Sequence, residues 1–122
     1  MKLFLALLLL SSFALAAAQR NPCDTMKIKV SETEVIAQNI ANIATTRTPA
    51  GGPYQRKYLK CDANDICEVR TEHKVIRSFE PNHPDADSAG YVAYPDINLD
   101  KEMKVLMRLN KQYAAAKSTC RL

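Results

Sequence analysis

Hydrophobic residues recur at helical spacing near the start of the charged part of the chain. Ile36, Ile40 and Ile43 follow one another at intervals of four and three residues, which places them in one stripe along a helix. Ser31 followed by Glu34 is a capping-box pattern that marks a helix start. The Pro and Gly residues of segment 49–53 stop the pattern. We therefore predict a helix over about residues 31–46.

A second helical pattern lies near the carboxyl end. Asn98 is a good amino-terminal cap, and Asp100 and Glu102 place acidic charge in the first turn, where the helix dipole favours it. The apolar stripe of this segment recurs in four-three alternation and consists of Leu99, Met103, Leu106, Asn110 and Tyr113. We predict a helix over about 98–118, packed through this stripe against the first helix.

Between the two helices the hydrophobic period changes from helical spacing to two. From Cys67 to Phe79, apolar and charged residues alternate, and 55–61 is a shorter candidate strand, with turn residues between the two. These segments predict a β-hairpin over about 55–80. Segment 81–97 carries three prolines and Gly90, and it predicts an extended, rigid loop. The expected fold class is α+β, with paired terminal helices, a central β-hairpin and an extended Pro/Gly loop.

The register of this hairpin bears on the disulfides. If Cys61 lies opposite Cys67, then apolar Leu59 faces Val69, and the pairs Lys60 with Glu68 and Arg56 with Glu72 match base to acid. Four cysteines allow three connectivities. This register favours a Cys61 to Cys67 bridge, which leaves Cys23 to Cys120, and a Cys23 to Cys67 bridge is the alternative that peptide mapping would have to exclude.

The first residues predict an export signal. Lys2 is followed by the apolar run 3–10 and by Ala16 and Ala18 as small cleavage-site residues. We expect a signal peptide over 1–18 and one domain over 19–122, exported to the periplasm without a stable membrane anchor. The net charge of +4, reduced by one when Lys2 is removed, is too small to predict nucleic-acid binding.

Candidate catalytic groups are sparse. His83, Asp85 and Asp87 lie in a proline-constrained segment whose acids can bond local backbone amides, and Cys61, Cys67 and His73 do not match zinc-ligand spacing. We predict no enzyme activity and no metal or cofactor site. Basic residues gather in the last helix, and a solvated helix face explains them better than a binding surface.

Three blocks of sequence carry a family resemblance: 38–57 (QNIANIATTRTPAGGPYQRK), 83–98 (HPDADSAGYVAYPDIN) and the Glu-Met pair at Glu102. Together they resemble flagellar basal-body rod proteins of the FlgC type. The resemblance implies a structural protein in which these positions hold the paired helices and make subunit contacts. The matching positions of interest are Asn39, Asn42, Gly51, Gly52, Pro53, Tyr54, His83, Pro84, Asp85, Asp87, Gly90, Tyr91, Tyr94, Pro95, Asn98, Glu102, Met103 and Tyr113.

The resemblance therefore predicts a structural or accessory component of the bacterial flagellar basal body. Its expected partners are other rod or ring proteins, or further copies of itself. Two features depart from the family pattern, the predicted signal peptide and the short terminal helices. They leave a second hypothesis open, a secreted, disulfide-stapled protein-binding module that reuses the rod-protein fold.

Overall fold

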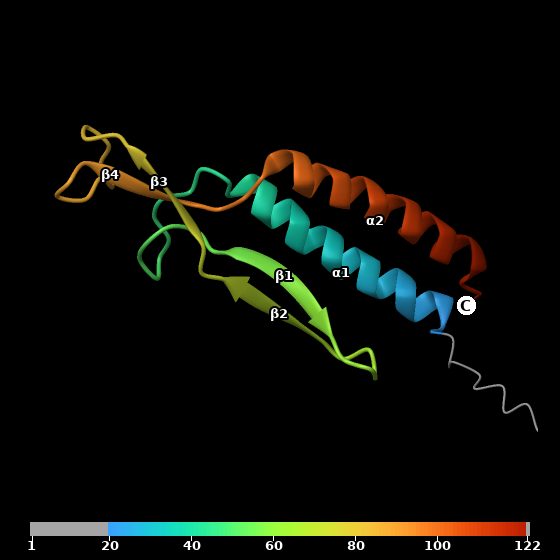
Figure 1. Ribbon diagram of the computed structural model, residues 1–122. Helices are drawn as coiled ribbons and strands as arrows, with labels where there is room; N and C mark the ends of the chain where they lie inside the picture. The colour runs from blue at the N-terminus through green and yellow to red at the C-terminus, as the bar shows by residue number, and fades with distance from the viewer. Residues whose placement is uncertain (1–19, 122) are drawn as a thin grey trace, which may run out of the picture.

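The computed structural model describes residues 20–121; the predicted signal peptide lies outside the described residues. Figure 1 shows two long helices side by side, α1 (Pro22–Ala41) and α2 (Leu99–Thr119), with α1 between α2 and a hairpin of β1 (Arg56–Cys61) and β2 (Cys67–Glu72). A second hairpin, β3 (Val75–Phe79) with β4 (Tyr91–Pro95), lies at the end of the molecule that is far from the ends of the described chain. The predicted α+β class with paired terminal helices and a hairpin is confirmed.

Helix α1 differs from the prediction at both ends. It begins at Pro22, where the Asn21 side chain accepts a hydrogen bond from the Cys23 amide at 2.8 Å. Ser31 is not a cap, because it lies in the middle of the helical segment, where its hydroxyl donates to the Lys27 carbonyl at 3.3 Å. The alternation of Lys and apolar residues over 27–30 concealed the helical period. The helix ends at Ala41 rather than near residue 46, and Asn42 caps it.

Helix α2 lies close to the predicted segment, and Asn98 caps it by accepting a hydrogen bond from the Lys101 amide at 3.0 Å. The predicted apolar stripe is wrong, because the buried residues are Glu102, Leu109 and Ala116. Leu99 is instead 47% exposed and Met103 43% exposed. A buried glutamate in the seam explains the error, since a hydrophobicity pattern cannot assign a charged residue to the core.

The first hairpin confirms the predicted register. Arg56 pairs with Glu72, Leu59 with Val69, and Cys61 with Cys67. Disulfides join Cys61 to Cys67 and Cys23 to Cys120, the pairing that the register favoured. The second bridge ties the start of α1 to the end of α2, with the two Cα atoms 4.7 Å apart.

The remaining segments correct two predictions. The stretch from Cys67 to Phe79 is not one strand, because it is interrupted at His73 and Lys74 and its halves belong to different two-stranded sheets. The expected loop 81–97 contains β4, which pairs with β3 so that Phe79 faces Tyr91 and Val75 faces Pro95. Pro95 is accommodated because it ends the strand. We predicted a loop because of the prolines in this segment, although Tyr91, Val92 and Tyr94 are residue types that favour strands.

The hydrophobic core is small and follows the helix pair into the hairpins. It contains Ile28, Val35, Ile36, Tyr54, Val92, Ile97, Leu109 and Ala116, joined by buried Asn39 and Glu102. Neither helix of the described chain has the length and apolar character needed to cross a membrane.

Candidate assembly surface and the contacts that support it

Asn39 joins helix α1 to the first hairpin. Its side chain is fully buried, its amide donates to the Lys57 carbonyl at 2.8 Å, and its carbonyl oxygen accepts from the Lys57 amide at 2.8 Å. The same oxygen accepts from the Tyr54 hydroxyl at 2.9 Å. One asparagine thus bonds both backbone groups of a β1 residue, as a neighbouring strand would, and attaches the hairpin to the helix.

Arg56 and Glu102 join the hairpin to helix α2. The Glu102 side chain is 3% exposed, and its Oε1 accepts a hydrogen bond from Arg56 Nε at 2.5 Å. Arg56 also approaches Glu72 across the hairpin at 3.5 Å. Burial, followed by the nearby Glu102 charge, raises the pKa of Tyr54. Two buried polar contacts, at Asn39 and Glu102, therefore fix the relative positions of both helices and β1.

A tight turn redirects the chain between α1 and β1. The Gly51 amide donates to the Thr48 carbonyl at 2.9 Å, and the Tyr54 amide donates to the Thr45 carbonyl at 3.0 Å. Gly51 and Gly52 have φ angles of +86° and +72°, a left-handed conformation that side chains disfavour. Pro53 follows, half-buried, and leads into buried Tyr54. The Gly-Gly-Pro-Tyr block is thus required for backbone direction.

Asp85 connects this turn to the 83–87 block. Its carboxylate accepts a hydrogen bond from the Thr46 hydroxyl at 2.6 Å and forms an ion pair with Arg47. Its own amide donates to His83 Nδ1 at 3.0 Å. The Thr46 hydrogen bond, with a smaller contribution from Arg47, lowers the pKa of Asp85. Pro84 lies exposed between His83 and Asp85. Through Asp85, this block is attached to the segment that follows α1.

We expect Thr46→Val to raise the pKa of Asp85 towards its ordinary value of 3.8, because the hydroxyl stabilises the ionised carboxylate. A depressed carboxyl pKa contributes stability above its unfolded value and loses it as the pH falls through the folded value. The variant should therefore show weaker acid destabilisation than the original protein. NMR titration of the Asp85 carboxyl measures the shift; Thr45→Val is the matched control and should leave it unchanged.

The second hairpin is closed by Asp87. Its carboxylate accepts from the amides of Ala89 and Tyr91, each at 2.9 Å, and pairs with Arg77. The Tyr91 amide is the main cause of a lowered Asp87 pKa. Gly90 has a φ angle of +88°, and a Cβ there would lie 2.8 Å from the Phe79 ring. The turn is therefore specified by both Asp87 and Gly90.

The two tyrosines of β4 have different environments. The Tyr94 hydroxyl donates to Glu80 at 2.7 Å, and this hydrogen bond raises the pKa of Tyr94. Tyr91 is 41% exposed and contacts the Phe79 ring edge-on, with the ring centroids 5.3 Å apart. Tyr94 holds the hairpin together, whereas Tyr91 presents part of an aromatic pair to solvent.

The family positions thus divide into three groups by burial. Asn39, Tyr54, Gly90, Pro95 and Glu102 are buried. The exposed group includes Tyr91, Asn98 and Met103, while Asn42 and Tyr113 are half-buried. The sequence patterns did not single out Val30, Ile76 and Met107, which are exposed. Of these three, only Met107 had a signal in the sequence, because it lies four residues after Met103 on the same helix.

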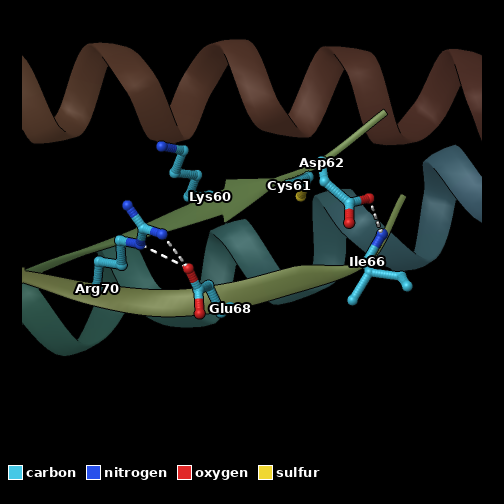
Figure 2. A pocket seen from close by; sticks show the side chains of 6 residues that line it. All are labelled: Lys60, Cys61, Asp62, Ile66, Glu68 and Arg70. Atoms are coloured by element: carbon cyan, nitrogen blue, oxygen red, sulfur yellow. Dashed lines mark hydrogen bonds and ion pairs between the residues drawn. The ribbon is translucent and has the colours of Figure 1, made fainter. Parts of the chain in front are cut away.

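A pocket of about 250 Å³ lies beside the Cys61 to Cys67 bridge. Figure 2 shows that the Arg70 guanidinium reaches Glu68, with Nε 2.6 Å from the carboxylate, and that Asp62 accepts from the Ile66 amide at 3.0 Å. Lys60, Cys61 and Ile66 complete the lining. Two of its charged residues pair with each other and Asp62 bonds the local backbone, so the lining belongs to the local structure of the hairpin end.

These contacts define a class of protein. In the described part of the chain, the polar residues of the motif blocks hold helices and hairpins together, the arrangement expected of a structural protein with paired terminal helices.

We compared the chain with known proteins. No family model matches the chain. It is 30% identical over 94 residues to the flagellar basal-body rod protein FlgC of Escherichia coli O6:H1, covering 66% of this chain and 69% of that protein. FlgC of Borreliella burgdorferi is 29% identical over 110 residues (67% and 72%), and FlgC of Agrobacterium fabrum is 25% identical over 114 residues (83% and 81%). The chain belongs to the FlgC family of flagellar basal-body rod proteins.

Proposed function

We propose that this protein is a non-enzymatic structural component of the flagellar basal body that works in the periplasm through contacts with rod or ring proteins. One observation carries the proposal: side chains of all three motif blocks meet at the joints between the helices and the hairpins, through Asn39, Asp85 and Glu102. The blocks that the chain shares with the family pattern are thus used to build its frame.

The disulfides support the compartment. Structural disulfides persist in oxidising compartments such as the periplasm and are rare in the cytosol. Two bridges, one of them joining the terminal helices, fit a chain that is exported in a less folded state and oxidised afterwards. The amino-terminal leader over 1–18 supplies the export route in this proposal.

Fractionation of the bacterium that encodes the protein tests the proposal. We expect the protein to remain with purified basal bodies after gentle detergent extraction, and a deletion strain to lose motility. The control strain carries the chain without residues 2–18, which should stay in the cytosol with reduced thiols and fail to restore motility. Recovery from culture fluid alone, together with normal motility in the deletion strain, would instead favour the secreted binding module.

A further inference from the structure

The hydrogen bonds of the second hairpin show which backbone groups of β3 face away from β4. At the two ends of the hairpin, the Asp96 amide donates to the Lys74 carbonyl at 3.1 Å and the Glu80 amide donates to the Gly90 carbonyl at 2.9 Å. In an antiparallel pair, hydrogen-bonded rungs alternate with rungs whose backbone groups point away from the partner strand. The even-numbered residues of β3 therefore bond β4. Three residues of β3 point their backbone groups outward: Val75, Arg77 and Phe79.

The outer edge of β4 is closed by the chain itself. The Tyr91 amide donates to the Asp87 carboxylate at 2.9 Å, and the Tyr91 carbonyl accepts from the Asp87 amide at 2.8 Å. Pro95 has no amide hydrogen, and its carbonyl accepts from the Ile97 amide at 2.9 Å. On this edge, only the outward groups of Ala93 lack a backbone partner within residues 20–121.

The outer edge of β3 is open. No backbone group of the described chain bonds the outward amides and carbonyls of Val75, Arg77 and Phe79. Solvent reaches this edge, because Val75 is 50%, Ile76 51% and Phe79 63% exposed. Figure 1 shows the hairpin of β3 and β4 reaching beyond the helix pair. A row of unpaired backbone groups on an exposed strand is a template for the addition of another strand.

A third outer edge, on β2, has a different composition. In the first hairpin the Asp62 amide donates to the Ile66 carbonyl at 3.0 Å, and the same alternation turns the backbone groups of Val69 outward. Three of the six residues of β2 are charged: Glu68, Arg70 and Glu72. Charged residues on an edge discourage strand addition. Strand β3 has one charged residue, Arg77, so it is the edge better suited to a partner strand.

The side chains of β3 indicate what a partner strand contains. Val75, Arg77 and Phe79 share one face of β3, because side chains alternate along a strand. Arg77 lies over the Tyr91 ring, 5.5 Å from the ring centroid, and pairs with Asp87. These contacts hold the guanidinium in the middle of this face. In an added strand, apolar residues opposite Val75 and Phe79 and an acidic residue opposite Arg77 give the favourable cross-strand pairs.

We propose that the outer edge of β3 binds an extended peptide segment of another protein as a third, antiparallel strand. The segment carries an acidic residue opposite Arg77, with an apolar residue two positions away on each side. The outward backbone groups of β3 supply the hydrogen bonds, and the alternating side chains supply the selectivity. Two β3 strands from two copies fit less well, because pairing them in full register sets two Arg77 side chains directly opposite each other.

This inference goes beyond the proposed function and does not depend on it. Strand addition is a property of the purified protein, whereas the proposed function concerns where the protein lies in the cell. The two ideas fail separately, because basal-body fractionation tests one and peptide binding tests the other.

Hydrogen exchange followed by NMR on the purified, oxidised protein tests the inference. The probe is a synthetic peptide, Thr-Val-Thr-Glu-Thr-Val-Thr, blocked at both ends. In the free protein the three outward amides of β3 should exchange faster than the inward amides of Ile76 and Ser78. Saturating peptide should slow the outward three by at least about tenfold, while the outward amides of Val69 and Ala93 keep their rates.

Proline substitution tests the edge from the protein side. Val75→Pro removes an outward amide hydrogen and leaves the bonds between β3 and β4 in place, and it should weaken peptide binding in fluorescence anisotropy by about tenfold. Ala93→Pro removes an outward amide hydrogen from the closed edge and should leave Kd unchanged. A peptide N-methylated at its glutamate should also bind about tenfold more weakly, and this test leaves the protein unaltered.

Charge reversal tests the acidic position. Arg77→Glu should weaken binding of the glutamate peptide, and a peptide with lysine at that position should bind the variant better than it binds the original protein. Slow exchange at Ile76 and Ser78 checks that the hairpin is intact in each variant. Binding that ignores the charge at Arg77 overturns the inference, and so does protection of the β2 edge in place of β3. Outward β3 amides that already exchange slowly in the concentrated free protein would show that a second copy occupies the edge, which also overturns it.

Discussion

Replacing both Cys23 and Cys120 with serine should lower the free energy of unfolding by about 4 to 5 kcal/mol, the value that chain-entropy reasoning gives for a closed loop of about 100 residues. The bridge spans a sequence separation of 97, so its removal releases a long closed loop and increases the conformational entropy of the unfolded chain. The hydrophobic core of the folded domain is small, so it offsets little of this gain in the entropy of the unfolded chain. Urea unfolding of the oxidised protein and of the double variant measures the difference.

The second bridge provides an internal comparison. Cys61 and Cys67 are separated by 6 positions, and the same reasoning gives a loss of about 2 kcal/mol when both are replaced with serine. The ratio of the two losses therefore tests the loop-length explanation without any outside reference. Equal losses, or a larger loss from the short loop, would show that native-state contacts around the sulfurs dominate.

Asn39→Leu should cost about 3 to 5 kcal/mol of unfolding free energy, although the new side chain has a similar size and favours helix. The change removes three hydrogen bonds and leaves the amide and carbonyl of Lys57 without the partners they have now. Each buried polar group left unsatisfied costs about 1 to 3 kcal/mol. Hydrogen exchange at the Lys57 amide should accelerate together with the loss of stability, because that amide then loses its acceptor.

Asn42→Leu is the matched control. Asn42 caps the same helix, is only half-buried, and donates to the Gln38 carbonyl at 2.8 Å without contacting the hairpin. We expect a loss of about 1 kcal/mol, the net contribution of a typical hydrogen bond, and no change in exchange at Lys57. If both substitutions cost the same, the strand-like bonding of Asn39 is not what attaches the hairpin.

The sequence was informative where chemistry is local or paired. The hairpin register followed from matching Lys60 with Glu68 and Leu59 with Val69, and this fixed Cys61 opposite Cys67. The Asn98 cap was recognisable because the capping side chain and its amide partner are neighbours in sequence. Each of these features depends on residues whose partners can be proposed from spacing alone.

Other features depend on contacts between distant segments. Glu102 is buried because Arg56 reaches it from the first hairpin, and without that contact the pattern selected the neighbouring stripe as core. Strand β4 exists because β3 lies beside it, whereas its own sequence is only five residues long and is preceded by Gly90 and ended by Pro95. Asn39 was chosen from a family resemblance, and its bonds to Lys57 were not foreseeable from residue type. Such pairings are set by tertiary structure rather than by local propensity.

The bridge between the chain ends also has a mechanical consequence. Because Cys23 and Cys120 are linked near the first and last described residues, tension applied at the two termini passes through a covalent bond and bypasses the helices and hairpins between them. Pulling on the ends leaves the domain unloaded. Force can unravel it only when it is applied elsewhere, for example to the far hairpin of β3 and β4.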